Sequence, residues 1–133
     1  NPLEHLYTLI NKKYIRSWPE EKLIEYIIQN KNHDKDYYNF HLAAYIYIET
    51  NTVPPVHVYS YNPKWWNGWG SDNSNEKKLT KELINSKPTI ITVSKKLKIP
   101  ESFNSFFDNY YAIVGSFKTN YLGNVDLYKR IKL

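Results

Sequence analysis

A short apolar run at residues 89–93 constrains the fold of this 133-residue chain more than any other stretch. The run reads TIITV, lies between Pro88 and Ser94, and is rich in β-branched side chains. Continuous apolar runs of this length are typical of central strands covered on both faces. We therefore predict an interior strand at residues 89–93, around which residues 87–130 supply further strands.

Helical and strand-like patterns alternate along most of the chain. The periodicity predicts helices over residues 3–12, 18–30 and 76–86, a short helix after Pro100, and strands over residues 37–41, 56–61, 111–117 and 125–131. The apolar run at residues 42–48 fits either a helix or a strand. The connection at residues 118–124 is short enough for a hairpin, which makes the last two strands antiparallel. The expected fold class is a three-layer α/β domain with a mostly parallel sheet and a C-terminal antiparallel hairpin.

Composition narrows the class of protein. The length suits a single domain over residues 1–133, and the apolar share of 41% is enough for one hydrophobic core. No cysteine is present, which excludes disulfides, thiolate chemistry and zinc–thiolate sites. No apolar run approaches the roughly 20 residues that span a bilayer. Because the chain begins at Asn1 and lacks methionine, we expect a fragment of a larger protein.

The net charge of +5 comes almost entirely from lysines, since Arg16 and Arg130 are the only arginines. Proteins that read nucleic-acid bases rely on arginine forks. A dispersed lysine excess is instead typical of a solvated surface, or of one that faces anionic lipid. The sequence therefore predicts no nucleic-acid partner.

Catalytic motifs are sparse. Asp34-Lys35-Asp36 matches the DxD pattern in which two carboxylates hold a divalent ion, but its place in a polar turn favours a solvated turn. The four histidines are too widely spaced to converge on a metal. We therefore predict no catalytic residues, no metal ligands and no cofactor, and keep a small metal-dependent α/β enzyme using Asp34 and Asp36 as an alternative.

Residues 62–75 form a long irregular stretch rich in tryptophan. Trp65, Trp66 and Trp69 lie within five residues of each other, beside Asn67 and Lys64. Tryptophan favours interfaces because its indole offers both apolar area and an N–H donor. These five residues are the candidate ligand or interface site, and the alternative is that the rings pack against the sheet edge.

Several segments resemble one known family. EYIIQN, AAYIYIETNTVPPVHVY, KPTIITVS, NYYAIVGSF and VDLYKR follow one another along residues 18–131. In this order they resemble the C-terminal soluble domain of membrane glycosyltransferases that use polyprenyl-phosphate sugars, such as protein O-mannosyltransferases and lipid A aminoarabinose transferases. The resemblance implies an extracytoplasmic domain whose partners are the transmembrane portion of the same protein and, beyond it, a glycan, a lipid-linked sugar or the membrane surface.

The same resemblance places the catalytic carboxylates in the membrane portion. It therefore implies a non-catalytic domain that supports the active site of a membrane-bound glycosyltransferase, or contacts its acceptor or the membrane surface. A different class of function is a stand-alone carbohydrate- or lipid-surface-binding module that uses Trp65, Trp66 and Trp69.

Overall fold

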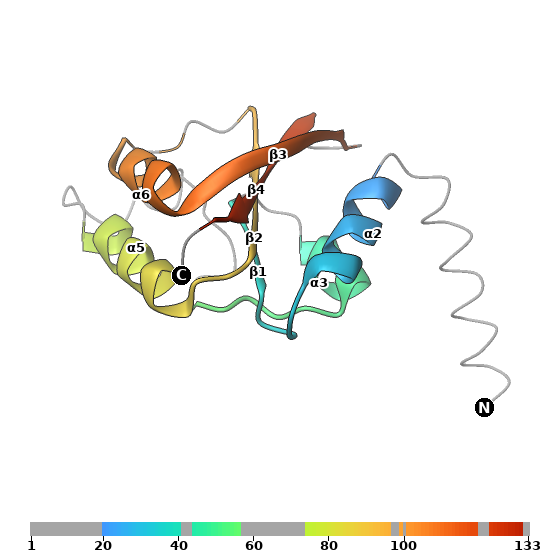
Figure 1. Cartoon of the computed structure of the whole chain (residues 1–133), viewed down its shortest axis with the longest axis horizontal. Coiled ribbons are helices and arrows are strands. Elements are labelled where there is room, and N and C mark those ends of the chain that lie inside the picture. Colours follow the sequence, from blue (N-terminus) through green and yellow to red (C-terminus); the bar gives the residue numbers. More distant parts are fainter. Residues whose placement is uncertain are drawn as a thin grey trace, which may run out of the picture.

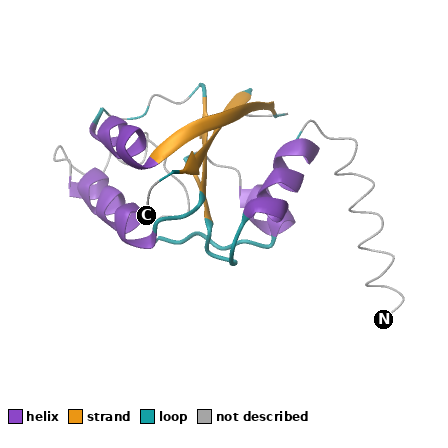
Figure 2. Ribbon diagram, viewed as in Figure 1, coloured by secondary structure: helices purple, strands orange, loops and turns teal. Residues whose placement is uncertain are grey.

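The computed structural model describes residues 20–40, 44–56, 74–96, 99, 101–119 and 123–131. Its elements, in chain order, are α2 (Glu21–Asn30), β1 (Tyr37–Asn39), α3 (Ala44–Thr50), α5 (Ser74–Ser86), β2 (Ile90–Ser94), α6 (Ser102–Tyr110), β3 (Tyr111–Lys118) and β4 (Asn124–Arg130). Figures 1 and 2 show α2 and α3 on one side of the sheet and α5 and α6 on the other. The layered α/β class is therefore confirmed.

The sheet is mixed, with the strand order β1-β2-β4-β3. Only β1 and β2 run parallel, whereas β4 is antiparallel to both β2 and β3. The expectation of a mostly parallel sheet is wrong, because the C-terminal hairpin inserts β4 next to β2 instead of adding it at the edge. The predicted antiparallel hairpin is confirmed. The predicted strand at 56–61 lies almost entirely outside the described residues.

β2 is the interior strand that the sequence predicts. It pairs with β1 on one side and β4 on the other, and all five of its residues are buried. Ile90 packs into the cluster that α2 and α3 cover, while Ile91 packs into the cluster beneath α5 and α6. Because successive side chains of a strand point to opposite faces, one five-residue strand contributes to both halves of the core.

The ambiguous run at residues 42–48 is helical from Ala44 onward. Ile46 and Tyr47 are buried on the face that packs with α2. α3 ends where Asn51 takes a left-handed φ of 54°, which asparagine tolerates better than most residues. The Lys31 ammonium donates to the carbonyl of Thr50 at 2.8 Å and thereby caps the carbonyl end of the helix.

Aromatic rings fill the other half of the core. The i, i+3, i+4 spacing of Phe103, Phe106 and Phe107 places all three on the buried face of α6. The centroid of Phe103 lies 5.1 Å from that of Phe40, and Phe107 lies 4.5 Å from Tyr128 of β4. These tilted and edge-on pairs are the arrangements that aromatic quadrupoles favour.

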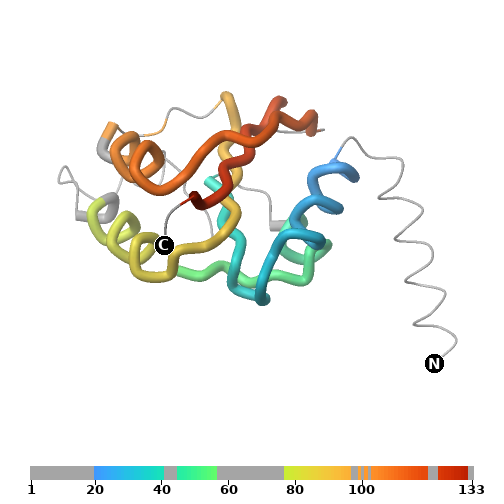
Figure 3. Tube along the Cα trace, in the orientation of Figure 1, coloured from blue at the N-terminus to red at the C-terminus, as the bar shows by residue number. Residues whose placement is uncertain are grey.

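The chain crosses from one side of the sheet to the other after α3. Figure 3 shows this segment, residues 51–56, running from α3 along one end of the sheet. The Val53 N–H donates to the Asp34 carbonyl at 2.7 Å, and Val56 packs against the aromatic cluster. The two α-layers are thus built from sequential halves of the chain, α2–α3 first and α5–α6 second. None of the described helices has the length and apolarity to cross a membrane.

Candidate functional site

The Asp34–Asp36 turn is a structural anchor. The Asp36 carboxylate is only 1% exposed and accepts the backbone N–H groups of Asn32 and Thr89, both at 2.8 Å. It therefore ties the turn before β1 to the start of β2, and the expectation of a solvated turn is wrong for this residue. Asp34 is exposed, as expected.

This geometry does not support the metal-enzyme alternative. Both Asp36 oxygens already accept structural hydrogen bonds, and the His33 Nε2, whose side chain is mostly exposed, lies 3.6 Å from the Asp36 Oδ1. Within the described ranges, no group of three histidine, aspartate or glutamate side chains could hold a metal ion.

The predicted tryptophan site, Lys64, Trp65, Trp66, Asn67 and Trp69, lies outside the described residues. Its role as a ligand or interface site stays a prediction.

One exposed polar cluster crosses the sheet. The Ser116 hydroxyl donates to the Asp126 carboxylate at 3.1 Å, and the Lys95 ammonium lies 3.6 Å from the same carboxylate oxygen. A serine nucleophile needs a base that is free to take its proton and donors for an oxyanion. Here the carboxylate is shared with an ammonium group on an open surface, so the cluster is best explained as a surface network.

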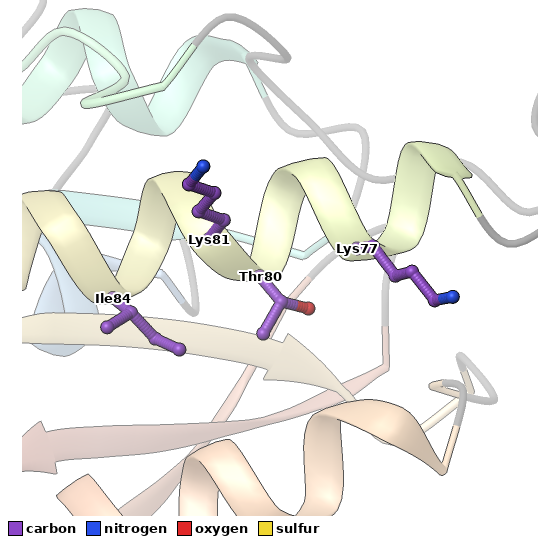
Figure 4. A pocket seen from close by; sticks show the side chains of 4 residues that line it. All are labelled: Lys77, Thr80, Lys81 and Ile84. Atoms are coloured by element: carbon purple, nitrogen blue, oxygen red, sulfur yellow. The ribbon is translucent and has the colours of Figure 1, made fainter.

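A shallow pocket of about 280 Å³ lies along α5. Figure 4 shows Lys77, Thr80 and Ile84 on one side of the helix and Lys81 projecting from the opposite side. Small-molecule sites in proteins are usually about 300–1,000 Å³ and enclose their ligand with convergent polar groups. This hollow is smaller, and the described residues that line it all belong to α5, so it carries no assignment.

The two edges of the sheet differ sharply. β1 is an edge strand of three residues, all buried, whereas β3 is an edge strand of eight residues whose side chains are mostly exposed or half-buried. Among the described strands, β3 pairs with β4 alone. Figure 1 shows β3 as the long outer strand that follows directly from α6. Within the described ranges, the side chains of the β1 edge are therefore buried, whereas the outer side of β3 pairs with no strand and is the open edge.

The hydrogen-bond pattern shows which groups of β3 face away from β4. The Arg130 N–H donates to Thr89 on the β2 side, whereas the Ile131 N–H donates to Tyr110 on the β3 side. Because antiparallel neighbours alternate between bonded and non-bonded pairs, the residues opposite Arg130 and Tyr128 direct their backbone groups outward. Those residues are Tyr111, whose N–H donates to the Phe107 carbonyl at the end of α6, and Ile113.

The same alternation continues beyond an irregularity between Ile113 and Gly115, where one extra residue, Val114, forms a bulge. The Thr119 N–H bonds to Gly123, so Ser116 and Lys118 direct their backbone groups outward. Among the described residues, the open edge therefore presents outward N–H groups at Ile113 before the bulge and at Ser116 and Lys118 after it, whereas the Tyr111 N–H already donates to the Phe107 carbonyl of α6.

Two large apolar side chains lie at the centre of this edge. Ile113 is 58% exposed and Val114 is 49% exposed. The sequence predicts the strand but not this site. Gly115 was the available signal, because a glycine inside a strand pattern often marks a bulge or a close backbone approach. Here the Phe117 ring leans over it, and a Cβ at position 115 would lie 3.3 Å from that ring.

Comparisons with known proteins correct the proposed resemblance. Residues 19–129 match the family described as "Putative competence-induced protein Ccs4 C-terminal domain". No curated protein and no solved structure matches the chain. The resemblance to membrane glycosyltransferases is therefore wrong, and the expected extracytoplasmic location rested on that resemblance alone. Its motifs were short apolar segments of helices and strands, which recur in the buried elements of unrelated folds. The chain belongs to the Ccs4 C-terminal domain family.

Proposed function

We propose that this domain is a non-catalytic protein-interaction module that binds an extended polypeptide segment along the open edge of β3. The observation that carries the proposal is an eight-residue edge strand with Ile113 and Val114 exposed at its centre. Addition of a strand to such an edge is a recurrent mode of peptide recognition, in which main-chain hydrogen bonds give affinity and side-chain contacts give specificity.

The β3 edge lacks most of the features that prevent an edge strand from pairing with a strand of another molecule. Edge strands are commonly short, covered, interrupted by proline or studded with charge. β3 contains no proline, and its only charged residue, Lys118, is at its end. The bulge and the terminal Lys118 are the features of β3 that would weaken continuous pairing. An edge of this length and apolarity favours a bound strand.

The energetics are sufficient for specific binding of modest affinity. Each backbone hydrogen bond contributes about 0.5–1.5 kcal/mol net. Covering the exposed parts of Ile113 and Val114 contributes about 2–3 kcal/mol together, from their exposed fractions and the transfer energy of full burial. After the cost of ordering the peptide, we expect dissociation constants on the order of micromolar.

The test uses a random peptide library displayed on phage and selected on the folded domain. We expect the enriched peptides to bind the unaltered domain and to lose binding to the variant Ile113→Lys/Val114→Lys, because two charges on the edge repel a strand and remove the apolar contact. A matched control is Ile48→Lys on α3. Ile48 is 76% exposed, and it lies on a helix outside β3, in the layer that α2 and α3 form on one side of the sheet.

The control should bind the peptides as the unaltered domain does, and all three proteins should unfold at similar temperatures. Enriched peptides that bind the double variant and the unaltered domain equally would contradict the proposal.

A further inference from the structure

The bulge in β3 changes which side chains share a face of the sheet. Ile113 pairs with Tyr128 and Lys118 pairs with Asn124. Positions 124 and 128 on regular β4 are four residues apart and therefore point to the same face. Without the bulge, residues five apart on β3 would point to opposite faces. Because Val114 is the extra residue, Ile113 and Lys118 lie on one face, four regular strand steps or about 13 Å apart.

This face offers an incoming strand two different contacts. Ile113 is an exposed apolar contact, and Lys118 is an exposed cation at the end of the strand. No acidic residue occurs between positions 109 and 125. The nearest carboxylate across the sheet, that of Asp126, already lies 3.6 Å from the Lys95 ammonium. The charge along the open edge of the sheet is therefore positive.

We infer that the segment bound at β3 carries an apolar side chain and a carboxylate four residues apart on one face, placed against Ile113 and Lys118. This inference rests on the proposed function and specifies the partner's chemistry. Directly opposite side chains on neighbouring strands lie about 4.5–5.5 Å apart, close enough for an apolar contact at one position and an ion pair at the other. Only a bound segment whose apolar and acidic residues are four positions apart can place them opposite Ile113 and Lys118 at the same time.

The same features disfavour a second copy of this chain as the occupant. Its β3 sequence, YAIVGSFK, has no carboxylate to offer to Lys118. Two copies would also bring together chains that each carry a net charge of +5. The partner is therefore a different, acidic segment.

The experiment selects the displayed random peptide library on the unaltered domain and, in parallel, on Lys118→Glu. On the unaltered domain we expect enrichment of Asp or Glu four residues from a large apolar residue, in either order, since the order reports only strand direction. On Lys118→Glu the apolar position should persist, and Lys or Arg should replace the acidic residue. Lys81→Glu serves as the control, because it reverses the same charge on an exposed lysine of α5, outside β3.

A synthetic peptide with the selected sequence gives the quantitative readout. Lys118→Gln should weaken its binding by about 1.5- to 5-fold, the range expected for an exposed ion pair. Ile113→Ala should weaken it by about 5- to 10-fold, from the area that the isoleucine has left to bury. Replacing the peptide's carboxylate by an amide should match the loss in Lys118→Gln, and the two changes together should cost no more than either alone.

Different results would contradict strand binding at β3 and the inferred chemistry of the bound segment. Peptides that lose binding to Ile113→Lys/Val114→Lys but show no acidic residue at a spacing of four would overturn the inference and leave strand binding intact. Peptides indifferent to the double variant would overturn both. Concentration-dependent dimers of the unaltered domain that disappear in the double variant would show that a second copy occupies the edge, which also contradicts the inference.

Discussion

Four buried tyrosines make the stability of this domain sensitive to alkaline pH. Tyr37 and Tyr38 are fully buried, and Tyr47 and Tyr111 are each 5% exposed. Burial raises the pKa of all four phenols far above the ordinary value of about 10, because a phenolate in the core loses its hydration. Hydrogen bonding to Thr92 offsets part of this effect on the pKa of Tyr37.

The sign of the effect follows from proton linkage. In the unfolded chain these tyrosines ionise near pH 10, whereas in the folded domain they keep their protons well beyond it. The stability they confer is therefore complete below about pH 10 and is lost as the pH rises toward the folded-state pKa values. At about pH 11 the loss is about 1.4 kcal/mol for each tyrosine and about 6 kcal/mol for all four. Since small domains are stable by only about 5–15 kcal/mol, we expect cooperative unfolding near pH 11–12.

The assay is urea denaturation followed by circular dichroism at about pH 9 and about pH 11. Tyr38→Phe is the sharpest variant, because the Tyr38 hydroxyl has no hydrogen-bond partner among the described residues. At neutral pH it should leave stability unchanged or raise it slightly, since no bond is broken. Between the two alkaline conditions it should lose about 1.4 kcal/mol less than the unaltered protein. A total loss below about 2 kcal/mol, or an identical loss in Tyr38→Phe, would refute the reasoning.

Three further changes test the core and its anchors. Ile91→Ala should cost about 2–5 kcal/mol of unfolding free energy in urea titrations, because Ile91 is fully buried in the central strand; an unchanged denaturation midpoint would show that β2 is peripheral. Asp36→Asn should cost about 1–3 kcal/mol, since an amide can accept only one of the two N–H groups that the carboxylate now satisfies, while Asp34→Asn on the exposed neighbour should change nothing. Lys87→Gly should increase the free energy of unfolding by about 1 kcal/mol and so raise the melting temperature, because position 87 has a left-handed φ of 48° at the end of α5. Equal effects of Lys87→Gly and Lys87→Ala would contradict this explanation.

Local patterns in the sequence were sufficient to place the buried elements. The β-branched run at residues 89–93 predicted the central strand, and the spacing of Phe103, Phe106 and Phe107 predicted the buried face of α6. Both patterns reflect burial of one segment against whatever surrounds it. They do not encode which strand lies beside which, so the insertion of β4 between β2 and β3 could not be predicted, and the sheet was expected to be mostly parallel.

The anchor at Asp36 and the open edge at β3 depend on long-range pairing. The Asp36 carboxylate accepts a hydrogen bond from the backbone N–H of Thr89, which is 53 residues away in the sequence. No local sequence motif predicts that bond. Similarly, the residues of β3 read as a strand whether it lies inside the sheet or at its edge. Its status as an edge follows only from the strand order.

The most direct test of strand binding at β3 is amide hydrogen exchange by NMR, with and without the best peptide from the phage selection. In the free domain, Ile113, Ser116 and Lys118 should exchange quickly, because their N–H groups face away from β4, while Ala112 and Phe117 should be protected. The peptide should slow exchange at Ile113 and Ser116 and leave α5 unchanged. If protection instead appears along α5, or Ile113 and Ser116 exchange at the same rate with and without peptide, β3 is not the binding edge.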